Sequence, residues 1–211
     1  MVHEYEPQVM IGSETATEIG CATTEEADHD APPLAHPRPA HAPAAATVAH
    51  RGRGVVGAAD GRVVEHFQWL ATHDWAMVTA VTETGTVLVE RCFKPGIGRL
   101  ALLLPAGAID AGEAPEAAMR RELLEETGYA ADDWTALGSF RLDPNYGVST
   151  GHLFLARGAR RVAEPDGRDL EEIEVVELAL GDALAAARSG ELASMGSAAC
   201  LALAALVLSP S

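Results

Sequence analysis

The chain has 211 residues, enough for one domain with a full hydrophobic core and an additional segment. Its formal net charge of −16 argues against a nucleic-acid partner, because phosphate backbones are bound by Lys and Arg. Three cysteines, Cys21, Cys92 and Cys200, form an odd and sparse set, which favours a reduced, cytoplasmic protein over a disulfide scaffold.

Residues 1–50 are expected to be a disordered tail that precedes a domain over 51–211. The tail begins with many acidic residues and continues with a run rich in Ala, Pro and His, and Arg38 is its one arginine. Such a segment buries too little apolar surface to offset the entropy lost on ordering. Its histidines are irregularly spaced, which favours a solvated linker over a metal site.

The next part of the chain is predicted to be β structure, with a short N-terminal strand unit at 51–75 and the domain core at 76–211. Apolar and polar residues alternate loosely over 63–69. Strands at 76–82 and 87–93 flank a Thr-Gly turn, which is typical of a hairpin. The apolar run at 100–104 predicts a buried strand.

A helix is predicted over 115–127. Pro115 suits the first helical position, where its missing N–H costs nothing, and Gly128 suits the left-handed position just past the end. Ala117 and Leu124 are expected on the buried back of this helix. The opposite face carries three carboxylates at i, i+3 and i+4: Glu122, Glu125 and Glu126.

Three like charges on one helix face repel each other, and a hard cation such as Mg²⁺ or Mn²⁺ relieves that repulsion. Arg121 lies beside the acidic face and can orient the carboxylates. A loop bracketed by Gly107 and Gly112 can bring Glu113 to the same ion. The alternative is a solvated Glu-rich surface helix, but the one-sided charges favour a metal site.

After the helix, strands are predicted at 134–142, 152–156 and 173–178, and helices over 181–187 and 192–208. A turn-rich loop at 143–151 contains Pro144 and Tyr146, and an acidic loop at 164–174 contains Glu171 and Glu172. The last apolar stretch is interpreted as a helix covering one sheet face; a membrane span is the weaker alternative.

The spacing from Gly107 through Glu113, Arg121-Glu122-Leu123 and Glu125-Glu126 to Gly128 resembles the Nudix box, with every fixed position filled. Tyr129 stands where an aliphatic residue is usual. The resemblance implies an α/β protein, a Nudix α/β/α sandwich with a mixed sheet. It also implies hydrolysis of a nucleoside diphosphate linked to another moiety.

The same resemblance implies roles for individual residues. Glu122, Glu125 and Glu126 would bind Mg²⁺ or Mn²⁺, and Glu113 with the carbonyl of Ala106 or Gly107 would complete the metal site. Arg121 would hold the carboxylates in place. Glu122, or else Glu171 or Glu172, would accept a proton from the attacking water.

Several flanking features resemble the ADP-ribose pyrophosphatase-like branch. These are Leu-Pro-Ala-Gly before the box, Glu-Glu-Thr-Gly-Tyr at its end, and Pro144, which lies 16 residues after Gly128. Arg91 begins a segment similar to that branch's Gln-Tyr-Arg, whereas Leu103 stands where the branch commonly has Glu. The implied reaction converts ADP-ribose to AMP and ribose 5-phosphate, with Pro144, Tyr146 and Arg91 as candidate substrate-binding residues. A homodimer through residues 53–75 is also implied.

Two alternatives remain open from the sequence. One is a Nudix enzyme for another nucleotide sugar, a dinucleoside polyphosphate or NADH. The other is a non-catalytic Nudix-like domain that senses a nucleotide; it is disfavoured because such domains usually lose carboxylates of the box, and here all are present.

Overall fold

The computed structural model of the chain describes residues 49–57, 63–146, 148–165 and 173–209. They fall into two compact units that divide between Trp69 and Leu70. Strands β1 (Ala49–Gly57) and β2 (Val63–Thr72) pair into a two-stranded sheet, and the division falls within β2. The disordered tail predicted for residues 1–50 lies outside the described residues, except for its last two positions, which begin β1.

The second unit is built on an eight-stranded mixed sheet. Its path is β10-β4-β3-β9-β7, with β5 paired to β4, β6 to β3 and β8 to β9. The β3–β9 pair is parallel and the other described pairs are antiparallel. The strands are β3 (Trp75–Thr82), β4 (Thr86–Lys94), β5 (Arg99–Leu103), β6 (Ala106–Ala108), β7 (Tyr129–Ala130), β8 (Asp133–Asp143), β9 (Val148–Arg161) and β10 (Glu174–Ala179).

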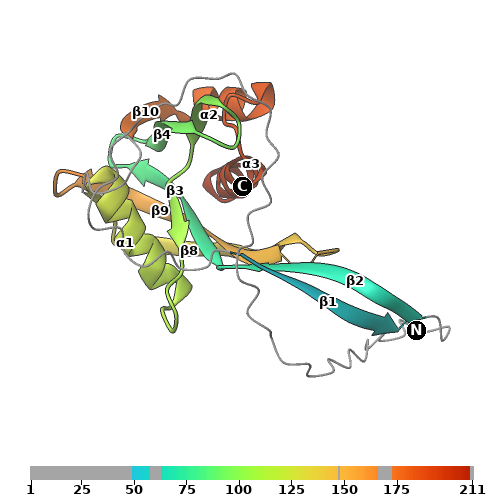
Figure 1. Ribbon diagram of the computed structural model, residues 1–211. Coiled ribbons are helices and arrows are strands. Elements are labelled where there is room, and N and C mark those ends of the chain that lie inside the picture. The colour runs from blue at the N-terminus through green and yellow to red at the C-terminus, as the bar shows by residue number, and fades with distance from the viewer. Residues whose placement is uncertain (1–48, 58–62, 147, 166–172, 210–211) are drawn as a thin grey trace, which may run out of the picture. The chain divides into compact units, whose positions relative to one another are not determined.

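Helices cover both faces of this sheet (Figure 1). Helix α1 (Pro115–Thr127) packs on one face, and α2 (Leu180–Ser189) and α3 (Met195–Leu208) pack on the other. Successive side chains of a strand point to opposite faces, so Val87 and Val89 enter the core beneath α2 and α3, whereas Leu88 enters the core beneath α1. The α/β/α arrangement predicted from the sequence is confirmed.

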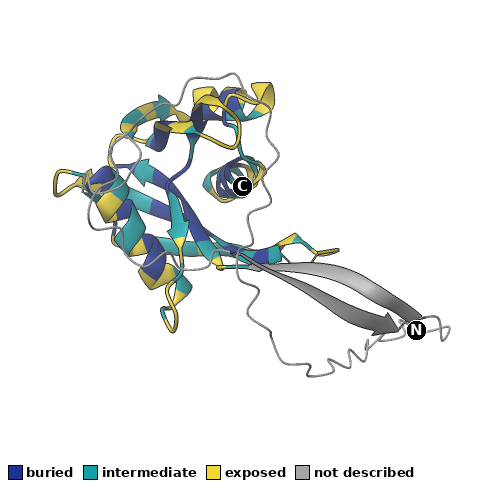
Figure 2. Ribbon diagram, in the orientation of Figure 1, coloured by how far each residue is buried: buried dark blue, intermediate teal, exposed yellow. Residues whose placement is uncertain are grey.

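The ends of α1 agree with the prediction, but its buried face does not. Figure 2 shows one dark face of α1 turned to the sheet. That face consists of Ala118, Met119, Leu123 and Thr127. Leu124 is 39% exposed and Ala117 is exposed, so the expectation that these two residues form the buried back was wrong. The i, i+4, i+8 row from Met119 to Thr127 determines which side of the helix meets the sheet.

Two other elements differ in length from the prediction. Strand β9 has 14 residues because it pairs with both β3 and β8, and only its middle was predicted. Helix α3 begins at Met195, after Ser194 accepts a hydrogen bond from the Ser197 N–H. The preceding Leu192 bridges to Leu102 instead of being helical. Among the described residues, none of the helices has the length and hydropathy needed to cross a bilayer.

Candidate active site

Helix α1 is held at both ends by local features of its sequence. Pro115 begins it, and Gly128 ends it with a left-handed φ of 75° and an N–H that donates to the Leu124 carbonyl at 2.8 Å. A Cβ at position 128 would lie 2.2 Å from the Ala163 carbonyl oxygen. Glycine is therefore required at position 128 for two reasons, its left-handed φ and the lack of space for a Cβ. It fixes the end of the helix beside the chain that leaves β9.

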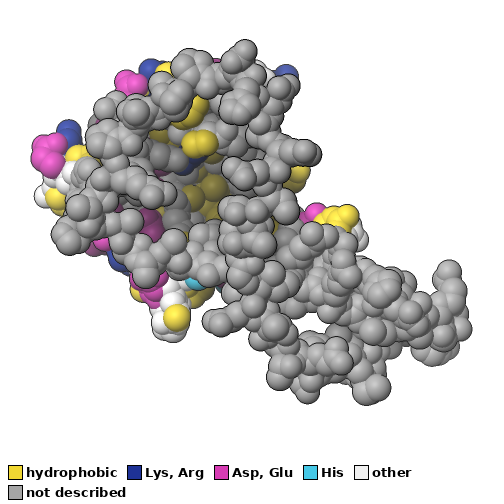
Figure 3. All heavy atoms as spheres, in the orientation of Figure 1, with side chains coloured by type: hydrophobic (Ala, Val, Ile, Leu, Met, Phe, Trp, Pro, Cys, Tyr) yellow, Lys and Arg dark blue, Asp and Glu magenta, His cyan; other side chains and the backbone are white. Residues whose placement is uncertain are grey.

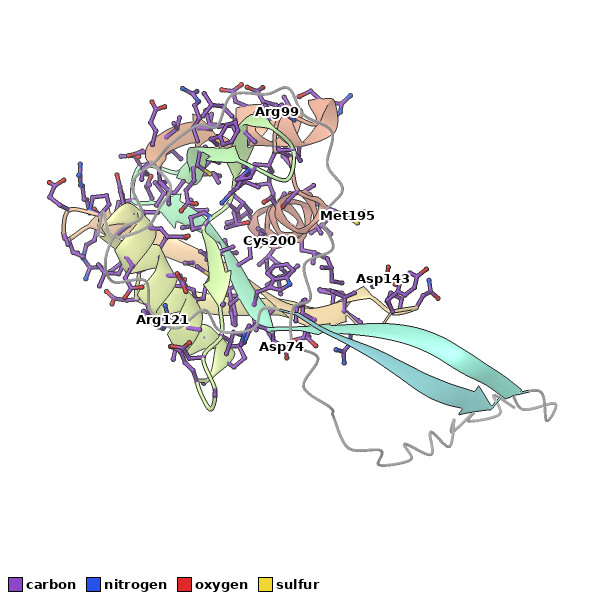
Figure 4. All side chains as sticks on the ribbon, in the orientation of Figure 1. Asp74, Arg99, Arg121, Asp143, Met195 and Cys200 are labelled. Atoms are coloured by element: carbon purple, nitrogen blue, oxygen red, sulfur yellow. The ribbon has the colours of Figure 1, made fainter. Side chains whose placement is uncertain are left out.

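Arg121, labelled in Figure 4, lies on α1 and forms ion pairs with three acidic side chains. Its guanidinium donates to Glu122 at 2.7 Å, to Glu113 at 3.0 Å and to Glu125 at 3.2 Å. It also donates to the Ala108 carbonyl at 3.1 Å, which joins α1 to the end of β6. The hydrogen bond from Arg121 lowers the pKa of the Glu113 carboxyl group, and the same carboxylates raise the pKa of Arg121. Arg121 therefore contacts three of the predicted metal ligands, and its orienting role stays a prediction.

Glu122 and Glu126 both meet the backbone of β6. The Ala106 N–H donates to Glu126 Oε2 at 3.1 Å. A Cβ at Gly107 would lie 2.0 Å from Glu122 Cδ, so only glycine leaves room for this carboxyl group. The Glu122 side chain is 16% exposed. Two carboxylates one helical turn apart thus converge on adjacent residues of one short strand.

A third carboxyl group, Glu90 of β4, lies at the same place and was not predicted. It is 3% exposed and shares a side-chain hydrogen bond with Glu126. Burial of Glu126, together with the adjacent Glu90 and Glu122, raises the Glu126 pKa well above its ordinary value. The sequence does contain a signal for Glu90, since it occupies the same strand face as the buried Leu88 and Cys92.

The donor set fits a hard divalent cation, although the carboxylates do not yet surround one point. Within the described part of the chain, no group of three or more Asp, Glu, His or Cys side chains already forms a cation site. Arg121 draws Glu113, Glu122 and Glu125 to itself, while Glu126 is turned to Ala106. Carboxylate oxygens are the ligands that Mg²⁺ prefers, and a cation would relieve the crowding of Glu122, Glu126 and Glu90. Acidic side chains are visible over α1 in the space-filling view (Figure 3).

The remaining predicted site residues either lie away from the α1 carboxylates or fall outside the described residues. Arg91 follows Glu90 in β4, so its side chain leaves the opposite face, where it pairs with Glu174 at 3.1 Å. Pro144 and Tyr146 are exposed in the turn between β8 and β9, and Tyr146 is 51% exposed.

Two of the predicted catalytic candidates, Glu171 and Glu172, lie outside the described residues. Leu103, where the ADP-ribose branch commonly has Glu, stands directly opposite Glu90 in the β4–β5 register. A carboxyl group is therefore present at this point of the sheet, but it comes from β4 and not from β5.

The NUDIX domain family model matches residues 72–193, which is more than half of the chain and contains the α1 site. The chain belongs to the NUDIX family. Enzymes of this family generally use divalent metal ions. The carboxylate face of α1 lies within the matched residues, and its oxygen ligands are of the kind that Mg²⁺ prefers.

Two curated relatives and one solved structure illustrate the similarity. The chain is 36% identical over 116 residues to an ADP-ribose pyrophosphatase of Bacillus subtilis, covering 54% of this chain and 63% of that protein. It is 37% identical over 89 residues to a GDP-mannose pyrophosphatase of Salmonella arizonae, covering 41% of this chain and 46% of that protein. The matches therefore span about half to two thirds of these relatives. A crystal structure of an ADP compounds hydrolase superposes with a TM-score of 0.66 at 19% identity, covering 78% of this chain and 89% of the other, which supports the fold.

Proposed function

We propose that this NUDIX protein is a pyrophosphohydrolase that cleaves the diphosphate of ADP-ribose to give AMP and ribose 5-phosphate, with Mg²⁺ or Mn²⁺ as its ion. The observation that carries the proposal is the convergence of Glu122 and Glu126 on the Ala106–Gly107 backbone, with Arg121 holding the neighbouring carboxylates. Similarity to the Bacillus subtilis ADP-ribose pyrophosphatase supports the choice of substrate.

Glu122, Glu125 and Glu126 would hold the ion, together with Glu113 and a carbonyl of Ala106 or Gly107. The bound ion supplies positive charge that neutralises the diphosphate, which matters in a chain whose net charge is −16. Arg121 keeps the carboxylates oriented through its three ion pairs. Water adds across the diphosphate bond, and the proton that it loses passes to a carboxylate, either Glu122 or one of Glu171 and Glu172.

A substrate panel tests the choice of ADP-ribose. Purified protein is assayed with Mg²⁺ on ADP-ribose, nucleotide sugars, dinucleoside polyphosphates and NADH, and we expect ADP-ribose to give the highest kcat/KM. Mass spectrometry of the products in H₂¹⁸O identifies which phosphate is attacked. A higher kcat/KM for any other compound in the panel would overturn this choice while leaving the metal-dependent hydrolysis in place.

The second candidate substrate is another nucleotide sugar. The similarity to a GDP-mannose pyrophosphatase favours it, and Leu103 is one position at which this chain departs from the ADP-ribose branch. GDP-mannose therefore belongs in the panel as the matched competitor, because it changes both the base and the sugar while keeping the diphosphate.

We further propose that the protein is a cytoplasmic homodimer, with residues 53–75 contributing to the interface. The sparse cysteines support a reducing compartment: among the described residues, Cys92 and Cys200 are both buried and neither forms a disulfide. Light scattering of the full chain at micromolar concentration tests the dimer, and a monomeric mass would contradict it.

A further inference from the structure

The buried Glu90 is not explained by the α1 motif. It sits near the middle of β4, flanked by Val89 and Arg91, and is 3% exposed. Acidic side chains are seldom buried in a sheet unless something holds them there, since an apolar residue of similar volume is often at least as stable. The presence of this carboxyl group in an apolar strand therefore suggests that it acts on the group that it contacts.

The group that Glu90 contacts is the Glu126 carboxyl group. The two side chains share a hydrogen bond, and Glu126 also accepts the Ala106 N–H at 3.1 Å. Glu126 is therefore held from two directions, by β4 through Glu90 and by β6 through Ala106. Glu122, one helical turn earlier, lies against the adjacent residue of β6, Gly107.

We propose that Glu90 is a positioning residue of the metal centre, which fixes the Glu126 carboxyl group against β6 so that Glu126 and Glu122 face one divalent cation. This inference rests on the metal site of the proposed function and adds to it a residue from outside the box. Residues that hydrogen-bond to metal ligands typically change metal affinity by about 10- to 100-fold when they are removed.

The test measures Mn²⁺ binding to the full chain by isothermal titration calorimetry, without substrate. Glu90→Leu fills the same space but cannot hydrogen-bond, so Glu126 loses one of its two restraints, and we expect Mn²⁺ affinity to fall about 10- to 100-fold. Glu90→Gln can still donate to Glu126, so we expect its affinity to stay within about threefold of wild type. Glu83→Gln removes one negative charge from the exposed β3–β4 turn and is the matched control, with wild-type affinity.

Each result has a distinct meaning. Loss of affinity in the leucine variant with retention in the glutamine variant supports positioning. Equal losses in both variants would overturn positioning in favour of a charge effect, and wild-type affinity in the leucine variant would show that Glu90 is only structural. If the leucine variant does not fold, Glu90→Ala removes the carboxyl group without adding branched volume and carries the same expectation. If the wild-type chain itself binds no Mn²⁺, the metal site of the proposed function fails, and not merely this inference.

Discussion

The Glu122 carboxyl group lies directly over Gly107. A Cβ on Gly107 would come within 2.0 Å of Glu122 Cδ, and the backbone φ of Gly107 is not among the left-handed values. The glycine is needed here for space and not for backbone freedom. Close packing of Glu122 on β6 therefore depends on Gly107, which lies 15 positions earlier in the sequence.

Gly107→Ala should therefore damage the site more than the fold. Alanine is compatible with this strand backbone, so the added methyl group acts mainly by displacing Glu122 from β6. We expect kcat/KM for ADP-ribose to fall by about 100-fold, since small displacements of a catalytic group have effects of that order. Steady-state kinetics measures the loss and circular dichroism verifies the fold.

Gly96→Ala is the control for this substitution. Position 96 lies in the turn between β4 and β5, where nothing stands within 4 Å of an added Cβ and φ is ordinary. It should keep wild-type activity. Equal activity in the Gly107 and Gly96 variants would show that the contact between Glu122 and β6 has no functional importance.

Arg121→Ala should lower both stability and rate. The substitution leaves Glu113, Glu122 and Glu125 without their shared guanidinium, and the Arg121 side chain is only 32% exposed. We expect a loss of about 1–3 kcal/mol in the free energy of unfolding, measured by urea denaturation. Arg160→Ala, whose ion pair with Asp132 is exposed on both sides, should cost at most about 1 kcal/mol. Similar costs for the two variants would argue against a special role for Arg121.

The metal-free protein should lose stability as pH rises, because of Glu126. Burial raises the Glu126 pKa from its ordinary 4.5 to about 10, so the folded protein keeps the proton more tightly than the unfolded chain. The resulting stabilisation is complete below pH 4.5 and is lost as pH rises toward the raised value. In EDTA, the melting temperature of wild type minus that of Glu126→Gln should therefore fall between acidic and alkaline pH. A difference that stays constant with pH would contradict this assignment.

Local signals made α1 predictable to the residue. Pro115 and Gly128 act within the chain segment that they terminate, and the spacing of the glutamates defines one helix face whatever the rest of the fold does. The direction in which that helix is buried was not predictable in the same way. Leu124 is as apolar as Leu123, and only the packing against β3 and β9 decides which of them is covered.

Long-range pairing accounts for the other differences between sequence and structure. The length of β9 follows from its two neighbours: β8 precedes it across a short turn, but β3, which sets its parallel pairing, is far away in sequence. Glu90 precedes Glu126 by 36 positions, and the sequence gives no measure of their proximity, although an acid in the buried phase of β4 could have marked it. The approach of Glu122 to Gly107 likewise required the β3–β6 pairing to be known.

The central claim is that the carboxylate face of α1 is a metal-dependent catalytic site, and Glu122→Gln tests it most directly. This substitution keeps side-chain size and helix propensity but removes the negative charge of Glu122. That charge would bind the ion, and in the metal-free protein it repels the carboxyl groups of Glu126 and Glu90. The measurement is kcat for ADP-ribose with Mn²⁺ and with EDTA, alongside the melting temperature in EDTA. We predict that wild type is active with Mn²⁺ and inactive in EDTA. We also predict that the variant loses activity by orders of magnitude while its melting temperature is unchanged or slightly higher. Wild-type turnover in the Gln variant, or full wild-type activity in EDTA, would contradict the claim.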